Sequence, residues 1–241
     1  SFEGVIDLVK MRAFYFVPDG LQRRIEERDI PADLVDDAAH WRHALEEAAA
    51  EHNEALMEKY IEGKPIPSDE IVPAIRHATV MNKLHPVFCG SARNKIGTRL
   101  LLDAVVAYLP SPLDIPPVVG HDPGNEGKEL VRKCDSNEPL TAYVFKIVAE
   151  KPMDLFFVRV YSGVLKSGSR VLNPARNKKE NISRMFRVFA KRREQLDEAG
   201  AGDIVAVVGL KDALTGDTLC EQKHPILLEK IEFPETVISL A

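Results

Sequence analysis

The sequence predicts an α+β protein of two domains, an α/β domain followed by a small closed antiparallel β-barrel. The 241 residues are enough for two ordinary domains. Helical and strand patterns are mixed before residue 110, whereas short strands separated by turn residues occupy the chain after residue 139. Between these parts, residues 110–117 hold four prolines, a composition typical of a semi-rigid spacer. We therefore expect a domain boundary at this spacer.

The first domain begins with a predicted β-hairpin. Residues 5–16 are rich in β-branched and aromatic side chains, which favour one strand or a pair of strands. The sequence Pro18-Asp19-Gly20 has turn chemistry, because proline fixes φ and glycine accepts positive φ. We expect the partner strand over residues 21–27.

Helices should follow the hairpin. Pro31 suits a first helical turn, and residues 31–62 predict one long helix. A buried stripe is expected where apolar residues recur at helical spacing: Leu34, Ala38, Trp41, Leu45 and Ala48. A second helix is predicted over residues 68–81.

An edge unit of an α/β sheet is expected next. Residues 86–90 suggest a short buried strand, and residues 98–109 predict an amphipathic helix. After the spacer, short strands separated by glycine and proline turns indicate the barrel. They are expected over residues 140–149, 155–161, 169–172, 182–189, 203–208 and 218–221.

Charge is distributed unevenly along the chain, whose net charge is −5. Residues 1–115 carry 13 basic and 19 acidic side chains, whereas residues 116–241 carry 19 and 18. Residues 166–193 hold ten Lys or Arg side chains and the single acid Glu180. A local positive field is therefore expected there.

Composition argues against secretion and membrane insertion. No run approaches the roughly 18 apolar residues that would span a bilayer, and the chain does not open with a basic and then an apolar segment. Three widely spaced cysteines, Cys89, Cys134 and Cys220, suit the reducing cytosol better than a disulfide framework or a zinc site. We expect a cytoplasmic protein whose two ends have been cut.

The order of short motifs resembles elongation factor G over nearly the whole chain. The matching stretches are Phe2-Glu3-Gly4-Val5-Ile6-Asp7-Leu8, Ile30-Pro31-Ala32-Asp33-Leu34, Cys89-Gly90-Ser91-Ala92, Leu101-Leu102-Asp103-Ala104-Val105, Tyr108-Leu109-Pro110-Ser111-Pro112, Phe157-Val158-Arg159-Val160-Tyr161-Ser162-Gly163, Gly202-Asp203-Ile204 and Gly216-Asp217-Thr218-Leu219-Cys220. Several are shared with other translational GTPases, while the long insert ahead of Cys89 is more particular to elongation factor G.

The resemblance implies a fold and a domain plan. Residues 1–115 would be the α/β insert subdomain together with the last strand and helix of a P-loop GTPase domain. Residues 116–235 would be the second domain, a small antiparallel β-barrel of the translation-protein type, and residues 236–241 the start of a third. The parent protein would be a monomeric ribosomal translocation GTPase that uses GTP and magnesium to move tRNA and mRNA during translation elongation.

Candidate site residues also follow from the resemblance. Ser91 and Ala92 match part of the loop whose backbone N–H groups contact guanine. The basic run, represented by Lys178, Lys179, Arg184, Arg187 and Lys191, would face RNA and protein of the small ribosomal subunit. The acidic side chains Glu47, Glu51, Glu54 and Glu58 would meet the C-terminal domain of the ribosomal stalk protein.

No catalytic residue, metal site or cofactor is expected in this stretch itself. The nearest approach to a phosphate loop is Gly127-Lys128-Glu129, with Asp122 where the first glycine is required and Glu129 where Ser or Thr would bind magnesium. Switch regions and the base-specific Asn-Lys-x-Asp are absent as well. The sequence therefore predicts a docking scaffold that does not bind GTP on its own.

Other functions stay open at this point. The parent could be a paralogue specialised in ribosome recycling, or the chain could be a non-catalytic RNA-binding adaptor module. His40, His43 and Glu47 fall on one helix face, so a small metal-dependent hydrolase is a third alternative, although no fourth ligand follows at suitable spacing.

Overall fold

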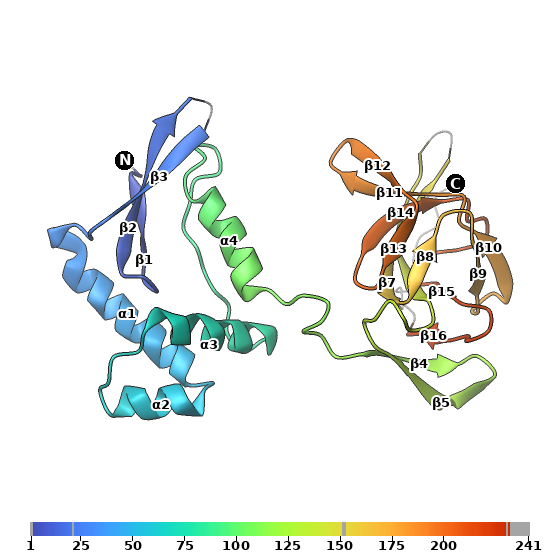
Figure 1. The fold of residues 1–241 in the computed structure, drawn as a ribbon, viewed down its shortest axis with the longest axis horizontal. Coiled ribbons are helices and arrows are strands. Elements are labelled where there is room, and N and C mark those ends of the chain that lie inside the picture. The colour runs from blue at the N-terminus through green and yellow to red at the C-terminus, as the bar shows by residue number, and fades with distance from the viewer. Residues whose placement is uncertain (1, 21, 151–152, 230, 232–241) are drawn as a thin grey trace, which may run out of the picture. The chain divides into compact units, whose positions relative to one another are not determined.

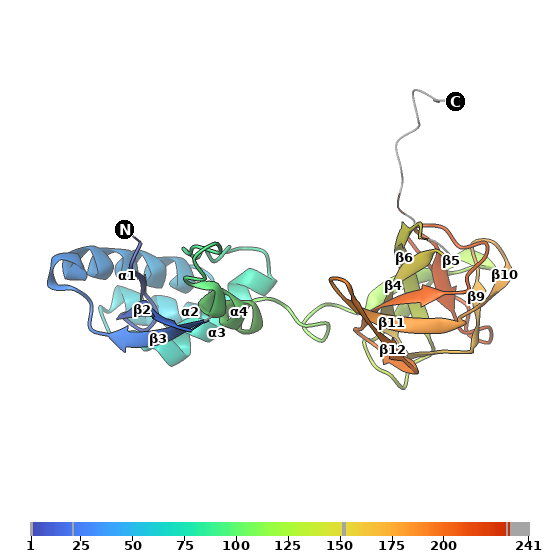
Figure 2. The ribbon, with the colours of Figure 1, turned by 90° about the horizontal axis from the view of Figure 1, so that it is seen from above.

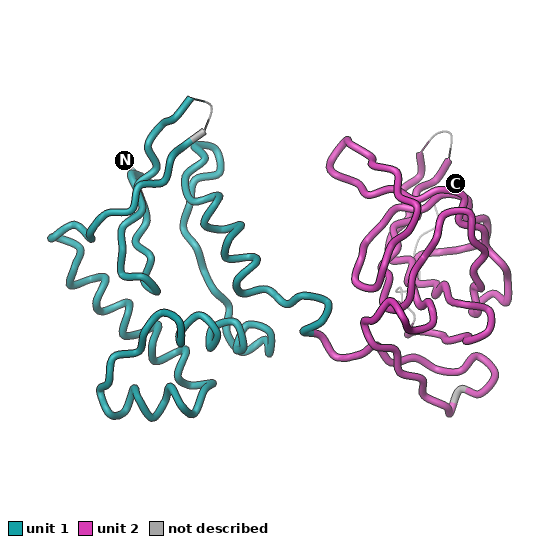
Figure 3. The backbone as a smooth tube through the Cα atoms, in the orientation of Figure 1, with its two compact units in different colours: residues 1–114 teal, residues 115–241 magenta. Residues whose placement is uncertain are grey.

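The computed structural model describes residues 2–20, 22–150, 153–229 and 231. The chain divides into two compact units, residues 1–114 and 115–241, which Figure 3 shows in different colours. The boundary predicted from the sequence lay between residues 115 and 116. The predicted start of a third domain, residues 236–241, lies outside the described residues.

Unit 1 begins with a three-stranded antiparallel sheet (Figure 1). Its strands are β1 (Gly4–Asp7), β2 (Arg12–Asp19) and β3 (Gln22–Arg28), with β2 in the centre. The predicted pair of strands over residues 5–16 and their partner strand are thus confirmed. Phe14 and Phe16 of β2 are buried on one face of this sheet.

The predicted long helix is wrong, because the chain forms two helices in its place. A short 3-10 turn (Ala32–Leu34) leads into α1 (Val35–Ala50), and α2 follows (Glu54–Ile61). Asn53 separates them with an extended backbone, and its side-chain oxygen accepts a hydrogen bond of 3.1 Å from the Leu56 N–H. Asparagine is a strong N-cap, so it starts a new helix here.

The buried stripe of α1 also differs from the prediction. Ala38 is buried, but Leu34 is 39% exposed and Trp41 is 59% exposed. The inner position beside Trp41 is taken by Arg42, whose side chain is only 13% exposed. Its guanidinium donates hydrogen bonds to backbone carbonyl groups, and a pattern of apolar residues cannot predict such a role.

Arg42 connects three segments of unit 1. It donates hydrogen bonds to the carbonyl oxygens of Leu8 and Val9, at 2.8 and 2.6 Å, in the turn between β1 and β2. It also donates to the Ile66 carbonyl at 2.6 Å and pairs with Glu46 at 2.6 Å. The turn, α1 and the segment before α3 are thereby fixed to one side chain.

The remaining helices of unit 1 are α3 (Ser68–Val80) and α4 (Thr98–Tyr108), as predicted. Arg76 of α3 donates to the carbonyls of Ala107 and Leu109, both at 3.0 Å, at the end of α4, and pairs with Asp114 at 2.6 Å. The last turn of α4 is therefore capped by a side chain from α3. Separately, apolar residues of α1, α2 and α3 pack together to form the main helical core of unit 1.

The predicted strand over residues 86–90 is wrong. These residues have no regular secondary structure, and Val87 is 88% exposed. A buried strand requires neighbouring strands to pair with, and the described residues supply none for this segment.

Unit 2 is made of β-strands (Figure 2). They are β4 (Val118–Asp122), β5 (Asn125–Arg132), β6 (Thr141–Val148), β7 (Leu155–Ser162), β8 (Val164–Lys166), β9 (Arg170–Asn173), β10 (Lys178–Asn181), β11 (Arg184–Phe189), β12 (Arg192–Leu196), β13 (Glu198–Gly200), β14 (Ile204–Val208), β15 (Thr218–Cys220) and β16 (Leu227–Leu228). All six barrel strands expected from the sequence are present. The β4–β5 hairpin and the short strands β8, β10, β12, β13 and β16 were not predicted.

The barrel is built from an antiparallel sheet in the order β10-β9-β15-β6-β7-β14-β11-β12. A pair, β8 with β13, and a small sheet, β16-β4-β5, complete it. The interior holds fully buried side chains such as Val144, Val158, Leu165, Met185 and Leu219. A second cluster around Cys220, Ile226 and Leu228 joins the small sheet to the barrel.

Replacing Arg42 with Met should lower the free energy of unfolding of unit 1 by about 3 kcal/mol, because three partly buried carbonyl groups lose their donor. All helices of the described residues lie in unit 1, so urea unfolding followed by circular dichroism at 222 nm reports on this unit. The control is Arg24→Met, since the Arg24 side chain is 67% exposed and its loss should cost less than about 0.5 kcal/mol. Equal midpoints for the two variants would contradict the role of Arg42.

Candidate functional site

The basic run predicted from the sequence is divided by the fold. Lys178 and Lys179 lie on β10, Arg184 and Arg187 lie on β11, and Lys191 is in the turn before β12. Strand β10 is at one end of the eight-stranded order and β11 with β12 at the other. Figures 1 and 2 show the β9–β10 and β11–β12 hairpins on opposite sides of the barrel. The structure therefore forms two basic surfaces from one run.

The β11–β12 hairpin combines positive charge with exposed aromatic surface. Arg184 lies over the Phe186 ring, 5.9 Å from its centroid, and Phe189 near the hairpin tip is 59% exposed. Arg187 and Lys191 are exposed, and neither has an ion-pair partner among the described residues. Cationic side chains beside an exposed ring suit contacts with phosphates and unstacked bases.

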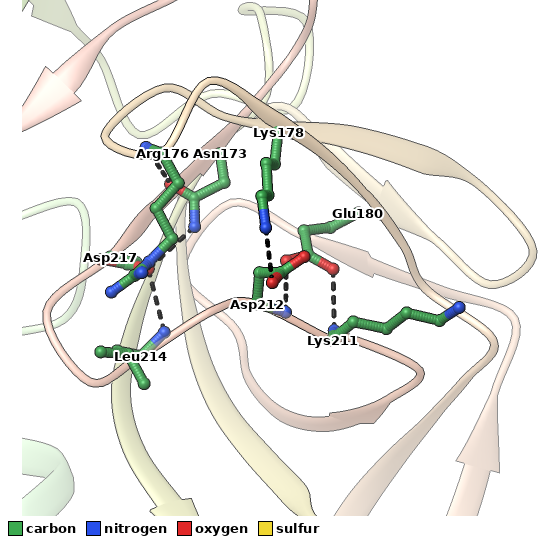
Figure 4. A network of polar contacts seen from close by, with 8 residues as sticks. All are labelled: Asn173, Arg176, Lys178, Glu180, Lys211, Asp212, Leu214 and Asp217. Atoms are coloured by element: carbon green, nitrogen blue, oxygen red, sulfur yellow. Dashed lines mark hydrogen bonds and ion pairs between the residues drawn. The ribbon is translucent and has the colours of Figure 1, made fainter.

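The basic surface on β10 is partly neutralised. Lys178 pairs with Asp212 at 2.7 Å, whereas Lys179 is exposed without an ion-pair partner in the described part of the chain. Glu180 follows Lys179 on the same strand but is only 2% exposed. Its carboxylate accepts hydrogen bonds from the N–H groups of Lys211 and Asp212, at 2.8 and 2.9 Å. Figure 4 shows these contacts. The single acid of the basic run thus anchors the loop after β14.

A second carboxylate fixes the other end of the same loop (Figure 4). Asp217, 6% exposed, accepts hydrogen bonds from Asn173, Arg176 and the Leu214 N–H, at 2.8, 2.8 and 2.9 Å. Burial raises the pKa of this carboxyl, but the three donors and the charge of Arg176 outweigh burial and leave the pKa below its usual value. The loop and the β9–β10 hairpin therefore depend on an ionised Asp217.

Ser91 and Ala92 lie in a closed loop that precedes α4. The Ser91 N–H donates to the Ile96 carbonyl at 2.9 Å, and the Ile96 N–H donates back to the Ser91 carbonyl at 2.9 Å. The Ser91 N–H is therefore already used within the loop, while the Ala92 N–H has no partner among the described residues. Of the two predicted guanine contacts, only Ala92 presents an available backbone donor.

Two glycines allow the chain to approach itself at the base of this loop. Gly97 has a φ of +77°, and a Cβ atom there would lie 3.0 Å from the Cys89 carbonyl oxygen. A Cβ atom on Gly90 would lie 2.9 Å from the Ile96 oxygen. Larger residues at these positions would open the loop.

The predicted acidic surface extends over two helices instead of one. Glu47 lies in α1 and Glu51 directly follows it, whereas Glu54 and Glu58 lie in α2. All four side chains are exposed. The pKa of the Tyr60 hydroxyl in α2 is raised by burial and by the negative charges of Glu47 and Glu46 in α1.

The histidines of α1 have other neighbours than a metal. His43 stacks on Tyr60 with ring centroids 5.1 Å apart, and its Nε2 lies 3.2 Å from the Tyr60 hydroxyl. His40 lies edge-on to Trp41. In the described ranges no three His, Cys, Asp or Glu side chains are grouped closely enough to hold a metal ion. Nor do these ranges contain a helix with the length and apolarity that crossing a membrane requires.

The strand order and the buried core define an antiparallel β-barrel domain. Residues 139–222, which include every strand from β6 to β15, match the family model "Elongation factor G domain 2". A crystal structure of a protein from Thermus thermophilus is similar to the chain, with a TM-score of 0.69 and 24% sequence identity. The similarity covers 92% of this chain and 30% of the Thermus protein. The family match thus assigns residues 139–222 to a β-barrel of the elongation factor G domain 2 type, and the structural similarity shows a shared fold over most of the chain.

Asp217→Asn should destabilise the barrel at pH 7 by about 1–3 kcal/mol, because a buried acceptor of three hydrogen bonds loses its charge. A carboxyl whose pKa is lowered by folding contributes stability above its unfolded pKa and loses it as pH falls through the folded value. The difference between the variant and the unmodified chain should therefore shrink below about pH 4.

Native-state hydrogen exchange of barrel amides at pH 7 and in acid would measure this difference. Asp212→Asn is the matched control, because its ion pair with Lys178 is exposed and should contribute less than about 1 kcal/mol. A cost of Asp217→Asn that stays constant with pH would contradict the ionised state.

Proposed function

We propose that this chain is the docking and scaffolding part of a ribosomal translocation GTPase of the elongation factor G type. The observation that carries this proposal is the match of residues 139–222 to elongation factor G domain 2, a family of translation elongation. The complete protein would use GTP and magnesium to promote movement of tRNA and mRNA through the ribosome. It would work as a monomer in the cytoplasm.

The uncovered face of α4 supports the part of this proposal that concerns the GTPase domain. Val106 is 80% exposed and Leu102 is 65% exposed, and Val87 of the preceding segment is 88% exposed. Apolar side chains gathered in this way are normally covered by another element. A helix of an α/β GTPase domain covers a sheet with such a face.

The same face argues against a free-standing adaptor module. An adaptor would gain nothing from exposing α4 and residues 86–90, and it would lose stability and solubility by doing so. The recycling paralogue remains a second candidate, since a barrel of this type would serve either task.

Catalysis is assigned to the GTPase domain of the complete protein and not to this chain. Of the nucleotide contacts, the chain would contribute the loop over residues 91–96, with the Ala92 N–H as the available donor to guanine. The residues 122–129 that come nearest to a phosphate loop form the β4–β5 hairpin in the structure, where Asp122 pairs with Lys128. A strand hairpin does not present the converging N–H groups that hold phosphates.

The two basic surfaces should both contribute to binding of the small ribosomal subunit. We expect the double variants Lys178→Glu/Lys179→Glu and Arg187→Glu/Lys191→Glu each to bind isolated small subunits more weakly. For each RNA phosphate that is no longer neutralised, the slope of log K against log salt concentration should fall by about one unit. Sedimentation of labelled protein with subunits over a salt series measures both quantities.

The matched control is Lys128→Glu/Lys223→Glu, which changes the charge equally on β5 and on the loop before β16. If all three double variants lose affinity equally, the effect is one of net charge. Unchanged binding by both test variants would refute an RNA role for these side chains.

The acidic surface should bind the C-terminal domain of the ribosomal stalk protein. Addition of that domain to labelled chain should shift the NMR signals of α1 and α2 around Glu47, Glu51, Glu54 and Glu58. Changing these four residues to Gln should slow association at low salt, because steering depends on the negative field. Changing Asp33, Asp36 and Asp37 to Asn provides an equally exposed acidic control. Absence of shifts on both helices would end this assignment.

A further inference from the structure

One arginine joins the sheet of unit 1 to the loop over residues 91–96. Arg23 of β3 donates from Nε to the Asn94 carbonyl at 2.6 Å and from Nη1 to the Phe16 carbonyl at 2.8 Å. Asn94 is 71 residues away in the sequence. The guanidinium therefore bridges the hairpin β2–β3 and the loop.

The same loop has a second attachment to the same sheet. Ile96 is 5% exposed and packs with Phe14 and Phe16 of β2. Leu100 in the first turn of α4 joins this cluster. Apolar contact thus holds one end of the loop, and Arg23 holds the carbonyl two residues before it.

The hydrogen bond from Arg23 to the Asn94 carbonyl lies where it can stabilise the loop conformation. Lys95 has a φ of +56°, which places it in the left-handed region of backbone conformation. This conformation is energetically unfavourable for any residue that has a side chain. The Asn94 carbonyl belongs to the peptide unit directly before Lys95. A donor bound to this carbonyl fixes the orientation of that peptide, and with it the turn that presents the Ala92 N–H.

We propose that Arg23 is a positioning residue for recognition of guanine. By holding the Asn94 carbonyl against β2, it orients the loop whose Ala92 N–H would donate to the guanine O6 atom. This inference rests on the proposed function, because it assumes that the loop contacts guanine in the complete protein. It adds that the insert sheet, and not the GTPase domain alone, sets the strength of that contact.

Arginine suits this bridge better than lysine. Its planar group presents Nε and Nη1 in a fixed fork that reaches two carbonyls at once, whereas an ammonium is a single point of contact. Arg24, the next residue, provides a matched control because its charged group pairs with Glu26 at 2.6 Å and its side chain is 67% exposed.

The first experiment uses the 241-residue chain. Hydrogen exchange of the Lys95 and Ile96 amides, followed by NMR, should be about tenfold faster in Arg23→Gln and unchanged in Arg24→Gln. A tenfold change corresponds to about 1.4 kcal/mol. Arg23→Lys should also exchange faster, because it cannot bridge both carbonyls. Equal exchange rates in Arg23→Gln and the unmodified chain would overturn the proposal.

The second experiment uses the full-length protein, expressed from its complete reading frame. Affinities are compared for GDP and for the 2,6-diaminopurine riboside diphosphate, in which an amino group replaces the O6 acceptor and N1 carries no proton. Arg23→Gln should weaken GDP binding about tenfold and leave binding of the diaminopurine nucleotide unchanged, whereas Arg24→Gln should alter neither. A general loss of stability would weaken both nucleotides alike and would count against a positioning role.

The two experiments separate the two ideas. If the unmodified full-length protein does not prefer GDP to the diaminopurine nucleotide, the proposed guanine contact is wrong, and the role of Arg23 fails with it. If the preference exists and survives Arg23→Gln, only the role of Arg23 is wrong.

Discussion

Both units are governed by the requirement that buried backbone polar groups find partners where no helix or strand supplies them. Unit 1 meets this requirement with arginines that donate to carbonyl groups: Arg42 at the β1–β2 turn and Arg76 at the end of α4. Unit 2 meets it with carboxylates that accept from N–H groups: Glu180 and Asp217 at the two ends of one loop. Loops in both units are thus ordered by charged side chains that form hydrogen bonds with backbone groups.

This use of charge explains where the sequence could predict the structure and where it could not. Periodicity located α3, α4 and the longer barrel strands, because their apolar spacing reflects burial directly. It misplaced Trp41, because an arginine took the inner position that an apolar stripe would assign to a tryptophan. The break at Asn53 was present in the sequence as an N-cap residue and was outweighed by the apolar pattern on both sides. Strands such as β10 and β12 are too polar for periodicity to identify.

The candidate sites show the same division. Residue types alone identified the charged surfaces, yet only the structure shows that the basic run is divided between the β9–β10 and β11–β12 hairpins. One basic run is thus shared between two surfaces of the barrel. The engagement of the Ser91 N–H within its own loop, and the bond from Arg23 to Asn94, depend on backbone geometry that no motif encodes.

The buried thiol of Cys220 can report on local opening of the barrel. Cys220 lies on β15, between β6 and β9, and is fully buried. Burial raises the pKa of its thiol, so the nucleophilic thiolate is disfavoured. An alkylating reagent can reach this sulfur only when β15 separates from its neighbours. The rate at which the Cys220 sulfur is modified therefore measures how often β15 separates from its neighbours. Cys89 is exposed and reacts without any such opening.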